Sequence, residues 1–375
     1  MSGERDRYVD ALRAVSLFVV VVWHWAFSIV LWTPTGPHLS NPIGTTHALW
    51  LLTWVLQVMP VFFFVGGFVN GLTWNSTVAA GLGYRGYISR RLRRLVGPAA
   101  LTMAAGLVLR AVLLVVIPDA AWVGPAIIAL LSPLWFLAVY VALVALTPVT
   151  SWVHERLNPI DLVLLVGLIA GVDLLRFRFE VGWIAWANFV LVWVFVHQLG
   201  YDYRRLLKLN GNAQAAIALG GLSALALLTN FGVYPRSMVG VPQESISNMG
   251  PPTACIAALG IFQVGLVLVL HPMGTRVLQR ARVSSAVSWM TANAMTIFLW
   301  HTWGYALAWG LVQVVGITIP GSTDGLWWAE RPLFLLLPAL CTFPFWWVFR
   351  RFDQGLPTVA TLMRGLAPAM RHQSR

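Results

Sequence analysis

Apolar runs of about twenty residues recur from one end of this 375-residue chain to the other. A helix of that length crosses the roughly 30 Å hydrocarbon core of a bilayer. Ten such runs are predicted as membrane spans, at about 10–32, 47–73, 96–117, 126–148, 161–176, 183–201, 214–231, 254–271, 287–311 and 331–349. The fifth and seventh runs are short and carry glycine or charge, so the number of spans is predicted to within one or two. We therefore expect an all-α, polytopic transmembrane helix bundle.

The composition and the chain start agree with a single membrane domain. Only 10% of the residues are charged, against roughly 25% in soluble domains. Charged residues crowd the start, and no small-residue cleavage site follows the first apolar run, so this run is predicted to stay as the first span. Because no predicted loop exceeds about 25 residues, we expect one membrane-embedded domain over 1–375, with its core at about 5–350 and a cytoplasmic tail at 351–375.

The cations predict the orientation. If the N-terminus is cytoplasmic, ten spans return the C-terminus to the same side. Twenty of the 25 Lys and Arg then lie on the cytoplasmic side, and Arg110 lies within the third span. The four on the outer side are Arg176, Arg178, Arg236 and Arg331. This is the positive-inside pattern of multi-pass membrane proteins, so the net charge of +12 reflects topology and does not indicate nucleic-acid binding.

Two other features of the sequence bear on possible sites. Cys255 and Cys341 both fall in predicted spans, so we expect neither a disulfide framework nor a metal site. The external loop at 232–253 is long, is rich in turn formers and carries Glu244. This loop either lines a substrate site or caps the bundle, and the sequence does not choose between these interpretations.

The first span carries Arg13 and His24 in an otherwise apolar run. Eleven helical residues make about three turns plus 20°, so the two side chains share one face and lie roughly 16 Å apart along the axis. Ionisable groups in a span face the protein interior or a water-filled cavity, because exposure to lipid is costly. The alternatives are an arginine that reaches the headgroups and a histidine that only packs against other helices.

These residues open a series of motifs that resembles the acyltransferase 3 family of integral membrane O-acyltransferases. Arg13 and His24 resemble the family's arginine-x10-histidine motif. The further matches, in order, are VMPVFFFVGGFVNG at 58–71, ISRRLRRLVGP at 88–98, SPLWFLAVY at 132–140 and NAMTIFLWHTW at 293–303. Gly66 stands where the family often has Ser, and Phe298 takes the aromatic position of the last motif. The resemblance covers about residues 5–350.

The resemblance implies an enzyme that transfers an acyl group, often acetyl, from cytoplasmic acyl-CoA to a hydroxyl of a sugar, polysaccharide or other glycan. It also implies a multi-pass protein of a cell membrane, expected to be a bacterial inner or cytoplasmic membrane. Such a transfer needs a base for the hydroxyl proton and a site that holds an anionic donor. His24 is the candidate base because imidazole titrates near neutral pH, and Arg13 lies where the donor would pass.

Three further groups are candidates for binding. Arg90, Arg91, Arg93 and Arg94 suit the phosphates of CoA and equally suit anionic lipid headgroups. Trp135 lines a donor or acceptor tunnel or belongs to an interfacial aromatic belt. His301 contacts the acceptor or relays a proton with His24, unless it is a buried structural histidine, and Glu244 is a candidate acceptor contact. No metal is expected.

Two other functions remain open from the sequence. Ten spans with an intramembrane histidine and Arg110 also suit a proton-coupled transporter of a small polar or acylated solute. The spans show no paired, Gly/Pro-broken segments in two matching halves, which counts against a transporter. A binding scaffold that keeps the same fold is the weaker alternative.

Overall fold

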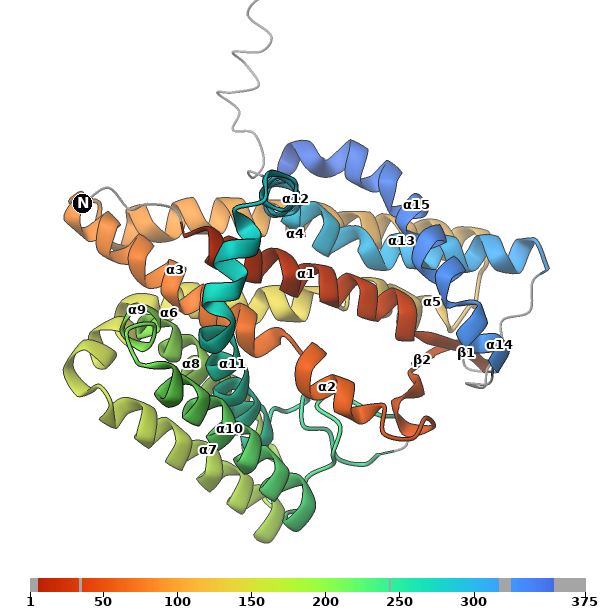
Figure 1. Cartoon of the computed structure of the whole chain (residues 1–375). Coiled ribbons are helices and arrows are strands. Elements are labelled where there is room, and N and C mark those ends of the chain that lie inside the picture. The colour runs from red at the N-terminus through yellow and green to blue at the C-terminus, as the bar shows by residue number, and fades with distance from the viewer. Residues whose placement is uncertain (1–5, 34–35, 243, 317–324, 354–375) are drawn as a thin grey trace, which may run out of the picture.

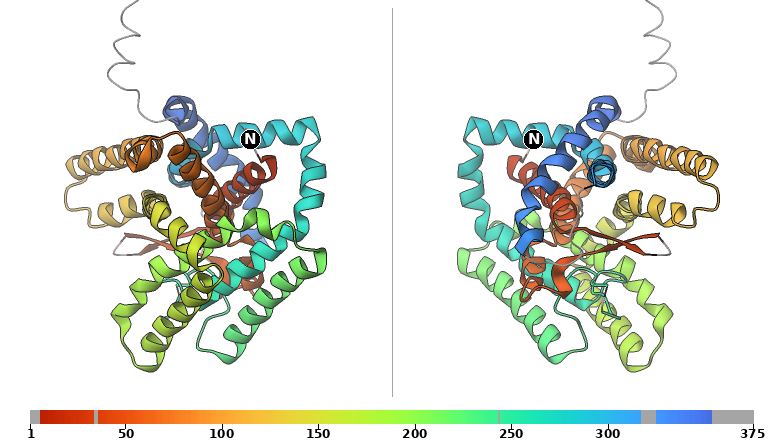
Figure 2. Two further views of the ribbon diagram at one scale, coloured as in Figure 1. Left: turned by 90° about the vertical axis from the view of Figure 1, so that its left-hand side faces the viewer. Right: turned by 90° about the vertical axis from the view of Figure 1, so that its right-hand side faces the viewer.

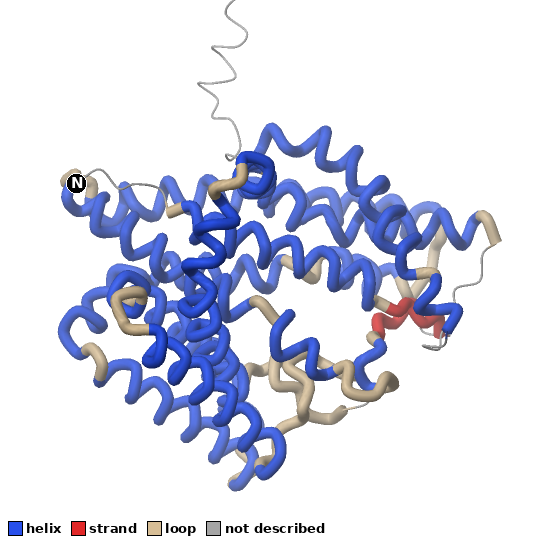
Figure 3. The backbone as a smooth tube through the Cα atoms, viewed as in Figure 1, coloured by secondary structure: helices blue, strands red, loops and turns tan. Residues whose placement is uncertain are grey.

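The computed structural model describes residues 6–33, 36–242, 244–316 and 325–353. Helices dominate this part of the chain, and the only sheet within it is one short hairpin (Figure 3). The long helices are α1 (Arg7–Phe27), α3 (Met59–Ala79), α4 (Gly83–Val116), α6 (Leu134–Leu157), α7 (Ile160–Arg178), α8 (Asn188–Tyr201), α10 (Gly211–Phe231), α11 (Ala254–Leu278), α13 (Ala294–Val314) and α15 (Arg331–Phe349). Each predicted span therefore corresponds to a helix, and the chain is an all-α polytopic bundle.

Eight helices in the described ranges are long and apolar enough to cross a membrane. The two predicted spans outside this set are α7 and α13. Four ionisable side chains within its 19 residues lower the hydropathy of α7: Asp161, Asp173, Arg176 and Arg178. Ten helices therefore correspond to the ten predicted spans. Eight of them are both long enough and apolar enough to cross a membrane.

Shorter elements join the spans. These are α2 (Trp50–Leu56), α5 (Val123–Leu130), α9 (Tyr203–Leu206), α12 (Ala281–Ala292) and α14 (Gly325–Ala329). The predicted span at 287–311 begins inside α12 and is broken at Asn293, where α13 begins. Figure 1 shows α12 end-on, so it runs across the direction of α1 and α13.

Helix α1 ends earlier than the sequence predicted. Its N-terminus is capped by Asp6, whose carboxylate accepts the backbone N–H groups of Tyr8 and Val9 at 3.0 and 3.2 Å. After Phe27 the chain leaves the helix and forms β1 (Ile29–Thr33), which pairs antiparallel with β2 (Gly36–Ser40). A Cβ at Gly36, where φ is +113°, would overlap Trp122, so glycine lets this hairpin pack on the segment before α5.

The connections of the bundle gather at two ends, as the predicted orientation requires. Figure 1 shows the α3–α4 and α6–α7 connections and α9 on the left, and the hairpin and α14 on the right. The left-hand connections carry the cations that the sequence assigned to the cytoplasm. By the predicted orientation, which stays a prediction, the left-hand end is the cytoplasmic one and the right-hand end the outer one, and we use these two names on that basis. The predicted tail from residue 354 onward lies outside the described residues.

The core of the bundle is centred on α3. Phe63 and Phe64 are fully buried there, and Phe63 lies against Trp193 of α8 with ring centroids 4.6 Å apart. Figure 2 shows the other helices arranged around these central elements. Helices α3 and α8 approach closely because Gly67 faces the carbonyl of His197, and Gly200 faces the carbonyl of Phe64. Small residues at a crossing let two membrane helices approach closely in this way.

The first prediction concerns this crossing. A Cβ at Gly67 would overlap the carbonyl oxygen of His197, so Gly67→Ala should lower the free energy of unfolding by about 1–3 kcal/mol. Gly167→Ala in α7 is the matched control, because a Cβ there meets nothing within 4 Å. Thermal unfolding of both variants in detergent tests this. Equal stability of the two variants would contradict the packing described.

Candidate active site

Three connected cavities lie along α1. The first, of about 450 Å³, contains Arg13 and is called the basic cavity. The second, of about 310 Å³, contains His24 and is called the outer cavity. The third, of about 270 Å³, also borders His24 and is called the apolar cavity. Arg13 and His24 thus face the inside of the bundle from one helix, in adjoining cavities and not in one undivided cleft.

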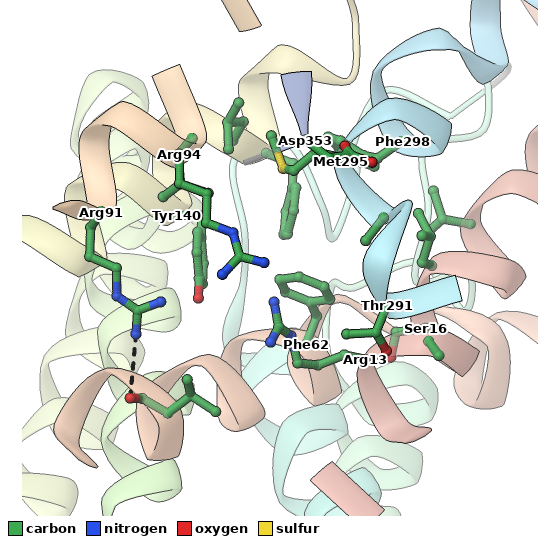
Figure 4. Close-up of a pocket in the computed structure, with 18 of the residues that line it drawn as sticks. Arg13, Ser16, Phe62, Arg91, Arg94, Tyr140, Thr291, Met295, Phe298 and Asp353 are labelled. Atoms are coloured by element: carbon green, nitrogen blue, oxygen red, sulfur yellow. Dashed lines mark hydrogen bonds between the residues drawn. The ribbon is translucent and has the colours of Figure 1, made fainter. Parts of the chain in front are cut away.

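The basic cavity takes its charge from two helices. Arg13 of α1 and Arg90, Arg91 and Arg94 of α4 line it, together with the carboxylate of Asp353. Figure 4 shows the guanidinium groups of Arg13 and Arg94 facing the same space, with Phe62 and Tyr140 beside them. Arg91 is held in place by donating to the hydroxyl of Thr73 at 2.8 Å. Because cations outnumber the single carboxylate, the cavity favours an anionic ligand.

Helix geometry separates Arg93 from the other basic residues of α4. Arg90, Arg91 and Arg94 fall within an arc of about 100°, whereas Arg93 lies roughly 100° from the centre of that arc. Arg93 is exposed and is not among the residues that line the basic cavity. The predicted cluster is therefore divided in the structure. The cluster lies on the same continuous helix as the third span, α4.

The basic and outer cavities meet at a ring of apolar side chains. Five residues line both cavities: Val20, Val58, Met59, Phe136 and Phe298. These residues come from α1, α3, α6, α13 and the segment before α3, so the ring lies where four spans converge. A narrow flexible chain is the kind of group that fits between such side chains.

The hydrogen bonds of His24 define its tautomer. Nδ1 of His24 lies 2.9 Å from Nε2 of His301, and Nδ1 of His301 lies 2.7 Å from the carbonyl oxygen of Phe298. A carbonyl oxygen only accepts, so His301 carries its proton on Nδ1 and accepts at Nε2. His24 then donates from Nδ1, which leaves the lone pair of its Nε2 available. The structure thus brings His301 to His24, and this pairing leaves His24 able to accept a proton.

His301 is more buried than His24. The side chain of His301 is fully buried, and its own backbone carbonyl accepts the indole N–H of Trp25 at 3.0 Å. His24 is half-buried because it borders the two cavities. Of the two imidazoles, therefore, His24 is the one that a bound molecule reaches.

The outer cavity carries polar groups that the sequence analysis did not select. Gln57 is held by the N–H of Met59, which donates to its Oε1 at 2.9 Å, so its amide nitrogen faces the thioether of Met249 at 3.0 Å. A thioether is a weak acceptor, which leaves this amide able to donate to a ligand. Asn41 lines the same cavity and donates to the carbonyl of Gly240 at 2.8 Å.

The long external loop both caps the bundle and lines the outer cavity. Met238 of this loop is fully buried, and its N–H donates to Thr53 of α2 at 2.9 Å. Val239, Gly240 and Met249 face the outer cavity. Glu244, the residue singled out in the sequence, is exposed and lines none of the three cavities.

Trp135 lies at the outer cavity and not at the basic one. It is 38% exposed and packs edge-on against Phe136 and Phe189. Phe136, its neighbour in the sequence, lines both cavities. Trp135 thus lines the outer cavity while remaining partly exposed, and its assignment to a substrate tunnel or to an interfacial aromatic belt stays a prediction.

Asp353 is the charged residue of the basic cavity that the sequence analysis missed. Its Oδ1 accepts the backbone N–H of Thr296 at 2.7 Å and the hydroxyl of Thr296 at 3.0 Å, which caps the first turn of α13. Its Oδ2 is buried without a hydrogen-bond partner among the described residues. Burial raises the pKa of this carboxyl to about 6.

Comparison with known proteins gives one match. The pattern of the acyltransferase 3 family, described as an acyltransferase domain, matches residues 6–351. No curated protein and no solved structure was found to match. The matched range includes Arg13, His24 and His301. It also includes every residue that lines the three cavities, with the exception of Asp353.

The second prediction concerns Asp353. Its pKa of about 6 in the folded protein lies above its ordinary value of 3.8 because burial penalises the charged form. Its contribution to stability is therefore fully present below about pH 4 and is lost as the pH rises to about 6. Asp353→Asn keeps the oxygen that caps α13 but does not titrate. As the pH rises from about 4 to about 6, the melting temperature of the wild type should therefore fall relative to the melting temperature of Asp353→Asn.

The control for this experiment is Asp119→Asn, which removes one carboxylate at an exposed position. Thermal scans in detergent at a series of pH values compare the three proteins. A constant difference in melting temperature between the wild type and Asp353→Asn from pH 4 to pH 6 would contradict the burial of an ionisable carboxyl.

Proposed function

This chain belongs to the acyltransferase 3 family and is a multi-pass membrane acyltransferase; on that premise we propose that it moves an acyl group from cytoplasmic acyl-CoA to a hydroxyl of a glycan. The acceptor class covers sugars, polysaccharides and other glycans, and the proposed location is a bacterial cytoplasmic membrane. The observation that carries the proposal is the position of His24, with a free Nε2, beside the apolar ring that separates a basic cavity from a polar one.

The basic cavity suits the donor. CoA has phosphates at one end and a thioester at the end of a long narrow arm. Guanidinium groups bind phosphate through paired, charge-assisted hydrogen bonds, and Arg13, Arg91 and Arg94 supply them from two helices. The rise of an α-helix separates Arg13 from His24 by about 16 Å along α1. An extended arm covers this distance and passes through the apolar ring to His24.

The residues around His24 suit acyl transfer. Nε2 of His24 takes the proton of the acceptor hydroxyl as its oxygen attacks the thioester carbonyl. The tetrahedral intermediate collapses with cleavage of the C–S bond, so that an ester remains. The departing CoA thiolate takes back the same proton. No proton, electron or co-reactant is left over, and the products are the acylated acceptor and free CoA.

His301 acts on this reaction through His24. When His24 is protonated, its Nδ1–H donates to the neutral Nε2 of His301, which the carbonyl of Phe298 keeps in the accepting tautomer. His301 is therefore a positioning residue that fixes the ring of His24 and its tautomer. The amide of Gln57, on the wall of the same cavity, is the donor available for the oxyanion or for an acceptor hydroxyl.

The outer cavity suits a glycan. It combines amide groups from Asn41 and Gln57 with the indoles of Trp23 and Trp135. Hydroxyl-rich molecules need hydrogen-bonding partners, and aromatic rings provide flat apolar surface for the faces of sugar rings. The cavity lies on the outer side of His24 by the predicted orientation. Transfer would then begin with a donor that enters from the cytoplasm and end with an acceptor on the opposite side of the ring.

The third prediction tests the roles of the two histidines. His24→Ala should lower release of CoA from acetyl-CoA by about 10²–10⁴-fold in purified protein, because the reaction loses its general base. His301→Ala should lower it less and should shift its pH profile. His301→Gln can still accept a hydrogen bond from His24 and should recover part of the activity. The KM for acetyl-CoA should stay within a few-fold of the wild type in all three variants.

Three outcomes would contradict the proposed function or these roles. Full activity in His24→Ala would exclude it as the base. Proton-coupled uptake of a solute into proteoliposomes without CoA release would favour the transporter interpretation. If His301→Gln recovered nothing while its fold and its KM were intact, the positioning role of His301 would be wrong.

The fourth prediction uses the division of the basic cluster. Arg94→Ala should raise the Kd for CoA by about tenfold or more, because a charge-assisted hydrogen bond contributes about 1.5–3 kcal/mol. Arg93→Ala removes the same charge from the same turn of α4 but outside the cavity, and should leave Kd within about twofold. Titration calorimetry in detergent measures both. Equal losses would indicate a general surface effect and not a donor site.

A further inference from the structure

The apolar cavity lies on a different side of His24 from the basic cavity. Its walls come from α4, α5 and α13, with Leu109, Ile127, Leu130 and Ala306 among the lining side chains. His24, Ser28 and Leu39 line both this cavity and the outer cavity. The two cavities therefore meet beside His24, where the proposed reaction places the thioester carbonyl.

Most of the side chains that line the apolar cavity are apolar, and two of the hydroxyl groups on its wall are already bound within the protein. The hydroxyl of Thr302 donates to the carbonyl of Leu130 at 2.8 Å, and that of Tyr305 donates to the carbonyl of Ser28 at 2.9 Å. A glycan in this cavity would give up hydrogen bonds to water and would replace few of them, which is unfavourable. An aliphatic chain has no hydrogen bonds to water to give up, and its transfer from water into an apolar cavity is favourable in free energy.

We propose that the apolar cavity binds the acyl chain of the donor, and that this protein transfers an aliphatic acyl group longer than acetyl. This inference rests on the proposed function, because it takes the donor to be an acyl-CoA with its thioester at His24. It departs from the acetyl group that the resemblance to the family made the usual expectation. Acetyl carries one methyl group beyond the carbonyl and leaves nearly all of the cavity empty.

The size of the cavity sets the expected chain length. Its volume is about 270 Å³, and a group the size of a water molecule occupies about 30 Å³. Allowing for imperfect filling, a chain of roughly six to eight carbons occupies it. Leu109 of α4 and Leu130 of α5 line the cavity, so we expect these side chains to set the length of the chain that binds.

The experiment measures the affinity of the purified full-length protein for a series of donors: CoA, acetyl-CoA, butyryl-CoA, hexanoyl-CoA, octanoyl-CoA and dodecanoyl-CoA. Each methylene that enters an apolar site should lower Kd by about fourfold. We expect Kd to fall from acetyl-CoA to hexanoyl-CoA or octanoyl-CoA and then to level off. CoA release should show the same preference.

Variants of the cavity connect this preference to the named side chains. Ala126 lines the cavity on α5, so Ala126→Phe should fill part of it and reduce the preference for hexanoyl-CoA over acetyl-CoA by at least tenfold. Leu109→Ala should move the preference toward longer chains. Ala111→Phe is the control, because Ala111 is exposed on α4 and is not among the lining residues of the cavity.

The outcomes separate this inference from the proposed function. Failure to bind CoA or any acyl-CoA would contradict the proposed function itself. Binding of all the donors with one affinity would keep the proposed function and overturn the acyl-chain site. If Ala126→Phe left the chain-length preference intact, the chain would bind elsewhere. Melting temperatures distinguish a blocked cavity from a misfolded variant, and Leu109→Ala gives an independent shift in the opposite direction.

Discussion

The hydrogen bond between His24 and His301 is the interaction on which the site depends. It joins the first span to α13 inside the bundle, at 2.9 Å between ring nitrogens. A carbonyl of α13 orients His301, and His301 in turn orients His24. Within a membrane protein a polar side chain has few alternatives to such partners, so the pair is held firmly. The result is one imidazole nitrogen that stays available where the outer and apolar cavities meet.

The surrounding packing maintains that junction. Asp353 caps the first turn of α13, the same helix that carries Phe298 and His301. Tyr305, one turn further along α13, is tied to the end of α1 through the carbonyl of Ser28. Helix α1 therefore contacts α13 by hydrogen bonds at two successive levels. Of the three cavities, only the basic one is lined by Arg and Asp side chains and only the outer one by amide side chains, while the third has neither, so each cavity suits a different part of the proposed reaction.

Periodicity predicted the part of the site that lies on one helix. The spacing of Arg13 and His24 is enough to place both on the inner face of α1, because an α-helix repeats regularly. The same arithmetic separates Arg93 from Arg90, Arg91 and Arg94. The positions of the long helices also followed from apolar runs, since a bilayer demands them; eight of the ten predicted spans are long and apolar enough to cross a membrane.

Contacts between distant segments were less accessible from the sequence. The pairing of His301 with His24 was one of several open interpretations, because a sequence separation of 277 positions gives no distance in space. Gln57 and Asp353 were missed because each is a single polar residue near the end of a span, a common position for a solvated group. The one signal for Asp353 was a carboxylate two residues after Arg351 in the sequence. Glu244 attracted attention as a charge in a polar loop, yet the backbone and neighbouring side chains of that loop line the cavity instead.

The central claim is that donor and base meet at the apolar ring, and a density map of the protein with a non-hydrolysable thioether analogue of an acyl-CoA tests it most directly. The account predicts phosphates among Arg13, Arg91 and Arg94, an arm that passes Phe136 and Phe298, and the carbon next to sulfur within reach of Nε2 of His24. A nucleotide bound outside the basic cavity, or an arm that ends before the ring, would contradict it.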